Sequence, residues 1–166
     1  MSQLGTPNPR AAGRASATQS AQLLGAVERM NGSWETKQDD GSWKPSHTFA
    51  TIAAGSVVRE TMFAGSSHEM EDIYHMDGTS LVCTHFCAAG NQPRMRATQA
   101  ITNPDGSVTI PFHFDSVTNL GSQSESYMGA MTLTIVDTNN ARQEWQQLEH
   151  GRPKGEPMLF ELHRVR

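Results

Sequence analysis

Short runs of alternating apolar and polar residues, separated by turn signals, recur along most of this chain. They follow one another at intervals of roughly 8–15 residues, as the strands of all-β proteins do. Asp77-Gly78 is a strong hairpin signal, and Asn103-Pro-Asp-Gly106 is a second turn. The absence of helical crossovers between the runs argues against a parallel sheet. The predicted strands cover residues 33–36, 46–52, 57–63, 69–76, 81–87, 94–100, 108–114, 126–136, 142–148 and 158–165.

An antiparallel meander of this size most economically closes into a barrel, because closure removes the exposed sheet edges. We therefore expect an up-and-down barrel of about eight to ten strands, which can hold one small ligand inside. A two-sheet sandwich is the alternative. Before the first strand, residues 22–30 carry Leu23, Leu24, Val27 and Met30 at helical spacing. A short helix is predicted there, ended by Asn31-Gly32.

The 166 residues fit a single domain. Residues 1–18 contain almost no large apolar side chains, so burial cannot offset the entropy of ordering them. We expect a flexible N-terminal arm over 1–18 and one domain over 19–166. A transit peptide is the alternative for the arm, since it carries Arg10 and Arg14 and no acids.

The charge balance argues against two classes of partner. A net charge of −4 fits neither nucleic acid nor an anionic membrane surface, which both favour a basic face. No apolar run approaches the roughly 18 residues that a membrane helix needs, and the N-terminus lacks the apolar core of a secretory signal. In a strand, Cys83 and Cys87 lie about 13 Å apart, too far for a disulfide. A cytoplasmic protein with free thiols is predicted.

Several segments resemble one group of proteins. Gly32-Ser-Trp34 follows the predicted helix and opens the first strand, as the Gly-x-Trp motif does in lipocalin-like (calycin) barrels. The segments 69–78 and 81–95 resemble a group of uncharacterised bacterial lipocalin-like proteins, and residues 133–137, 143–145 and 160–165 fit the same group. The resemblance covers 32–166. It implies a β-barrel and carries over no established reaction.

Side-chain alternation suggests which strand faces point into the barrel. In 69–76 the more apolar face holds Met70, Asp72, Tyr74 and Met76, and we expect it to face inward. In 81–87 alternation alone does not decide, and we choose the face with Cys83, His85 and Cys87 as inward.

A polar cluster inside the barrel would be costly unless its members are paired or functional. Apolar walls with a few convergent polar groups are typical of a ligand pocket. The alternative is that these groups face solvent or form a closed network. The cluster comprises Glu60, Tyr74, His85, Arg96 and His113, and Met70, Cys87 and Trp145 are further candidate ligand contacts.

His85 is the best candidate for a general base, because the pKa of histidine lies near neutrality, and Glu60 or Tyr74 is its candidate partner. Arg96 would suit a ligand carboxylate. Zinc held jointly by Cys83, His85 and Cys87 is disfavoured, because two sulfurs on one zinc lie within about 4.6 Å of each other. A nucleophilic pair of Cys87 with His85 is also disfavoured, since no acid that could orient His85 is evident in the sequence. We predict no metal and no cofactor.

The function that these features favour is binding of a small apolar or amphipathic molecule inside the barrel. The alternative is a small-molecule enzyme of the isomerase, cyclase or hydrolase type, with His85 as acid–base in the same pocket. A third hypothesis is an interaction module that forms a homodimer.

Overall fold

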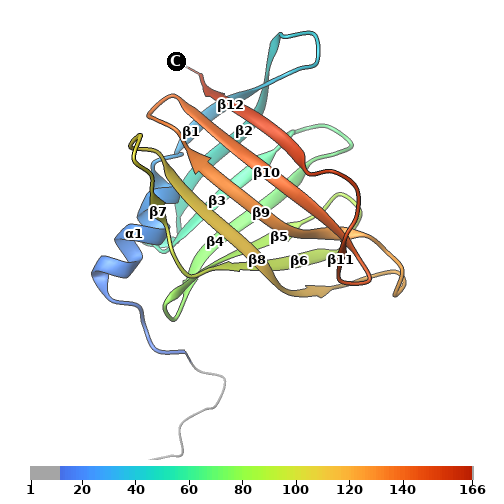
Figure 1. Ribbon diagram of the computed structural model, residues 1–166, viewed down its shortest axis with the longest axis horizontal. Helices are drawn as coiled ribbons and strands as arrows, with labels where there is room; N and C mark the ends of the chain where they lie inside the picture. Colours follow the sequence, from blue (N-terminus) through green and yellow to red (C-terminus); the bar gives the residue numbers. More distant parts are fainter. Residues whose placement is uncertain (1–11, 166) are drawn as a thin grey trace, which may run out of the picture.

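A closed antiparallel barrel forms the body of the protein (Figure 1). The structure is a computed structural model that describes residues 12–165. Ten strands close in the order β1-β2-β3-β4-β5-β6-β8-β9-β10-β12 and back to β1. The predicted all-β barrel is therefore confirmed. The strands are β1 (Gly32–Lys37), β2 (Trp43–Ile52), β3 (Val57–Met62), β4 (Met70–Asp77), β5 (Ser80–Phe86), β6 (Gln92–Ala97), β8 (Val108–Thr118), β9 (Tyr127–Ile135), β10 (Asn140–Glu149) and β12 (Met158–Arg164).

Two short strands and one turn complete the sheet. The two-residue strands β7 (Ile101–Thr102) and β11 (Arg152–Pro153) pair with β8 and β10, and a 3-10 turn, η1 (Ala53–Gly55), joins β2 to β3. The hairpin predicted at Asp77-Gly78 joins β4 to β5, and Gly78 adopts a φ of 60°, which side chains rarely allow.

Pro111 lies inside β8, which is not an edge strand. β6 pairs with residues 113–118 of β8, and β7 pairs with residues 108 and 109. Pro111 falls in the gap between these two partners, so its missing N–H interrupts no ladder on that side.

The helix α1 (Ala17–Glu28) lies across one end of the barrel and packs on β2, β3, β4 and β5 (Figure 1). It begins earlier than the predicted Gln22, because Ser16 and Gln19 form a capping box. Its buried face holds Leu23, Leu24, Ala26 and Val27. The helix thus begins inside the span expected to be an arm, and residues 1–11 of that span lie outside the described residues. Among residues 12–165, no helix has the length and apolar character to span a membrane.

Trp34 and Arg164 tie the helix to the seam where β1 meets β12. The Trp34 Nε1 donates to the Met30 carbonyl at 2.7 Å, and the Arg164 guanidinium carbon lies 4.3 Å from the centre of the Trp34 ring. Arg164 also donates to the carbonyls of Arg29 and Asn31 at the end of α1. The helix end is therefore the closed end of the barrel.

The opposite end is formed by the segments that connect the strands. The loops 63–69, 87–91, 119–126 and 150–157 gather there, away from α1 (Figure 1). Large buried side chains such as Trp34, Phe49 and Leu133 belong to the hydrophobic core.

Candidate functional site

Charged and polar side chains from four strands converge inside the barrel. Glu60 on β3, Asp72 and Tyr74 on β4 and Gln143 on β10 are each fully buried. His85 on β5 is 2% exposed, whereas its neighbour Phe86 is 46% exposed. The inward faces chosen from alternation for β4 and β5 are therefore confirmed.

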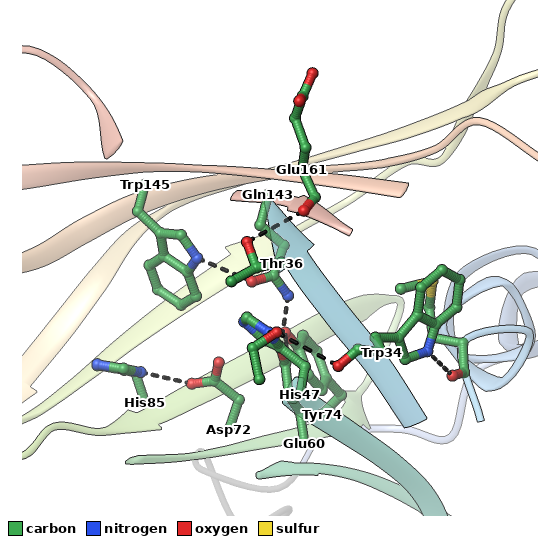
Figure 2. Close-up of polar contacts among 12 residues, drawn as sticks. Trp34, Thr36, His47, Glu60, Asp72, Tyr74, His85, Gln143, Trp145 and Glu161 are labelled. Atoms are coloured by element: carbon green, nitrogen blue, oxygen red, sulfur yellow. Dashed lines mark hydrogen bonds and ion pairs between the residues drawn. The ribbon is translucent and has the colours of Figure 1, made fainter. Parts of the chain in front are cut away.

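Glu60 is held by two hydrogen bonds. Its Oε2 accepts from the Tyr74 hydroxyl at 2.6 Å, and its Oε1 accepts from the Gln143 Nε2 at 2.7 Å (Figure 2). Gln143 in turn accepts from the Trp145 Nε1 at 3.1 Å. Burial, and then the negative charge of Asp72, raise the pKa of Glu60 well above its usual value. Both effects favour the neutral carboxylic acid, whereas the hydrogen bonds from Tyr74 and Gln143 favour the carboxylate.

Asp72 and His85 form a second, separate pair. They are direct cross-strand neighbours, and the Asp72 Oδ1 lies 2.7 Å from the His85 Nδ1. Burial disfavours the imidazolium, but the Asp72 carboxylate outweighs it and raises the pKa of His85 to about 10. At neutral pH the imidazolium form of His85 is therefore favoured. The ring of Trp145 covers His85, with ring centres 5.0 Å apart.

Cys87 follows directly after β5 and is half-buried, whereas Cys83 is fully buried. Both thiols are free, as predicted. The His85 imidazole beside Cys87 holds the pKa of that thiol below its usual value, while burial raises the pKa of Cys83. The sequence-based statement that no acid orients His85 is wrong, because Asp72 occupies that position from the neighbouring strand.

His47, on β2, was missed by the sequence reasoning. Its side chain is fully buried, its Nδ1 lies 2.7 Å from the Ser46 hydroxyl, and its Nε2 lies 3.7 Å from the Glu60 Oε1. The Nε2 has no hydrogen-bond partner within residues 12–165. Burial lowers the pKa of His47 to about 4, so the imidazole is neutral at pH 7. The available signal was the position of His47 two residues before Phe49. In a strand these two side chains share one face, and Phe49 is buried.

A cavity of about 660 Å³ opens beside His47 at the loop end of the barrel. Its walls include Trp34, His47, Phe63, Met70, Met158 and Phe160. The rings of His47, Phe63 and Phe160 pack against one another, with centres 5.4–5.8 Å apart. Of the predicted ligand contacts, Met70 lines this cavity, and Trp145 lines a smaller hollow of about 260 Å³ that shares Met158 with it.

The interior placement expected for Arg96 and His113 is wrong. Met95 and Ala97 are buried, so Arg96, which alternates with them on β6, points outward and bonds to Asp77 and Asp115. Phe112 fills the interior, so His113 is exposed on the outer face of β8. In the described part of the chain, no three His, Cys, Asp or Glu side chains gather closely enough to hold a metal ion.

Comparisons with known proteins support the fold and give no information on the site. No protein-family model matches the chain, and no curated protein matches it either. Among solved structures, the crystal structure of Rv2717c from M. tuberculosis is similar, with a TM-score of 0.60 and 15% sequence identity. The match covers 86% of this chain and 97% of that one. At this identity the likeness is one of fold, so the chain is a closed antiparallel β-barrel with a structural neighbour over nearly its whole domain.

Proposed function

We propose that this protein binds a small, uncharged amphipathic molecule at the loop end of its barrel. The observation that carries the proposal is the cavity of about 660 Å³ beside His47, whose buried Nε2 lacks a hydrogen-bond partner in the described chain. Such volumes are typical of small-molecule sites, and a few polar groups among apolar walls set the ligand's orientation. The aromatic and methionine side chains would hold the apolar body of the ligand.

The lining argues for a neutral ligand. Among the described residues that line the cavity there is no Asp, Glu, Lys or Arg. The polar side chains are hydroxyls, such as Ser46, Thr48 and Thr61, and the histidines His47 and His68. Burial keeps His47 uncharged at pH 7. A charged ligand group would lose its hydration without gaining an ionic partner, whereas a hydroxyl or carbonyl group needs only hydrogen bonds.

The resemblance of the sequence to lipocalin-like proteins fits this proposal, since barrels of this size can enclose one small ligand. The free thiols of Cys83 and Cys87 fit a reducing compartment such as the cytoplasm.

A second candidate, a small-molecule enzyme, is favoured by one observation. Asp72 holds His85 by its Nδ1, and the His85 Nε2 has no partner inside the described barrel. An oriented histidine with a free nitrogen is the arrangement that proton transfer requires. The acid that pairs with His85 is Asp72, however, and Glu60 is bound to Tyr74 and Gln143 instead.

Native mass spectrometry of the purified protein tests the binding proposal. We expect a retained mass of a small neutral molecule on the wild-type chain. Ala64 is exposed and lines the cavity mouth, so Ala64→Trp should fill the mouth and abolish the retained mass. Ser122→Trp places the same side chain on an exposed loop residue that does not line the cavity and serves as the matched control. Equal retention by both variants would refute binding in this cavity.

A further inference from the structure

We propose that Met158 sets the length of the molecule that this protein binds, because its side chain stands between two hollows at the loop end of the barrel. The larger hollow is the cavity of about 660 Å³ beside His47, and the smaller one has a volume of about 260 Å³. The inference rests on the proposed function and names its ligand class more closely. The ligand is a neutral molecule whose apolar chain lies in the larger cavity and ends at Met158.

The strand geometry places Met158 between the two hollows. Met158 begins β12, and the register pairs it with Trp145 on the neighbouring strand β10 (Figure 1). Phe160 lies two residues further along β12 and shares a strand face with Met158. Phe160 lines the larger cavity and Trp145 lines the smaller hollow, whereas Met158 lines both. Among the described residues that line the two hollows, Met158 is the one that they share.

The side chain of Met158 can be removed without harm to the core. It is 46% exposed, whereas Trp145 beside it is 2% exposed. A thioether is at most a weak hydrogen-bond acceptor, so its loss leaves no strong donor or acceptor without a partner. Methionine is also unbranched and adapts its shape to what it contacts. Truncation of Met158 to alanine should therefore join the two hollows and leave the fold intact.

The smaller hollow can accept the end of an apolar chain. Trp145 and Met128 supply apolar walls, and the charged side chains that line it are Lys154 and Glu156. The Lys154 Nζ donates to the Glu149 Oε1 at 2.6 Å, so its charge already has a partner, and Glu156 is exposed. A chain that passed Met158 would bury its methylene groups against the indole of Trp145, which favours binding.

The experiment measures the displacement of bound Nile red by 1-alkanols from hexanol to tetradecanol. In the wild-type protein, each added methylene should raise the affinity by about fourfold, as burial of one methylene does, until the chain reaches Met158. Longer alkanols should gain nothing further. In Met158→Ala the gain should continue past this limit. Alkanols at least two methylenes longer than the limit should then bind the variant about tenfold more tightly than they bind the wild type.

Two further variants separate the partition from a general loss of apolar surface. Leu159→Ala makes a similar truncation at the next residue, which is 54% exposed and lines neither of the two hollows, and should leave the length limit unchanged. Met158→Leu restores a side chain of similar volume and should restore the limit. Thermal unfolding checks that each variant is folded.

The fluorescence of Trp145 locates the chain end directly. The probe is an alkanol with a terminal bromine, two methylenes longer than the wild-type limit, since bromine quenches an indole that it contacts. Quenching should be greater in Met158→Ala than in the wild type, and the excess should vanish when Trp145→Phe is added. Equal quenching in the wild type and Met158→Ala would overturn the inference.

The displacement experiment distinguishes failure of this inference from failure of the proposed function. If the wild type binds Nile red and the alkanols but a folded Met158→Ala protein keeps the same length limit, the role of Met158 is wrong and the binding proposal stands. If the wild type does not bind Nile red, the binding proposal is wrong and the role of Met158 is overturned with it.

Discussion

Asp72 and His85 face each other from neighbouring strands, and their side chains meet at 2.7 Å in a fully buried setting. This pair makes the stability of the protein depend on pH. The pKa of His85 is about 10 in the folded protein against 6.5 for an ordinary histidine. Because the folded pKa is raised, its contribution to stability is complete below pH 6.5 and is lost as the pH rises to 10.

The Asp72→Asn variant tests this dependence. At pH 6 it should lower the free energy of unfolding by about 3–5 kcal/mol, as breaking a buried pair does. The difference from the wild type should shrink by pH 10, where His85 has lost its proton. Urea denaturation at both values of pH measures it. Asp115→Asn removes a carboxylate on the outer face, whose partners are arginines, and should show no such trend. A pH-independent cost of Asp72→Asn would contradict the charge state assigned to His85.

Tyr74→Phe removes the only hydroxyl that reaches the Glu60 Oε2 within the described residues. A buried carboxyl oxygen would then lack a donor, and we expect a loss of about 1–3 kcal/mol in unfolding free energy. Chemical denaturation at pH 7 checks the value. Tyr127→Phe, at a barrel rim where the ring packs on Phe114, is the control and should change stability by less than about 0.5 kcal/mol. Equal effects of the two changes would mean that the Tyr74 hydroxyl does not support Glu60.

Arg164→Ala removes the cation over Trp34 and the donors to the end of α1. We expect a loss of about 1–3 kcal/mol, from the lost hydrogen bonds and the lost contact with the indole. Arg164→Lys keeps a charge but cannot reach several carbonyls at once. Its free energy of unfolding should therefore lie between those of the wild type and Arg164→Ala. Hydrogen exchange of the α1 amides would show faster opening of the helix in both variants, and unchanged exchange would rule out this anchoring role.

Gly129 on β9 lies against the side chain of Leu148 on β10, and an added Cβ would collide with it. Gly129→Ala should therefore lower the free energy of unfolding by about 1–3 kcal/mol, as overpacking does. In a Leu148→Ala background the same change should cost much less, because the colliding atoms are gone. The four proteins form a double-mutant cycle measured by thermal and chemical unfolding, and additive effects would contradict the packing described here.

The barrel could be predicted because its signals are local. Alternation and turn residues mark each strand within its own segment, and ten strands with antiparallel neighbours have one economical way to close. The helix start was missed although its signal, the Ser16–Gln19 capping box, is also local. The inward face of β4 followed from alternation, which placed Asp72 and Tyr74 correctly, and Glu60 lies inside as expected for a member of the polar cluster.

The site was harder to predict because it depends on pairing between distant strands. Gln143 donates to Glu60 although the two residues are 83 positions apart in the sequence, and no local pattern predicts that contact. The Asp72–His85 pair depends on the register of β4 against β5, which follows from the turn at Gly78 only once its geometry is known. The errors at Arg96 and His113 were avoidable, since their apolar neighbours already marked the inward faces of β6 and β8.

The central claim is that the cavity beside His47 binds an uncharged amphipathic molecule, and titration with the neutral fluorescent probe Nile red tests it most directly. We predict saturable binding to the wild-type protein and to Ser122→Trp, with a blue-shifted emission that reports an apolar environment. Ala64→Trp, which fills the cavity mouth, should lose this binding while keeping the same unfolding temperature. Absence of saturable binding to the wild type, or undiminished binding to a folded Ala64→Trp protein, would contradict the account.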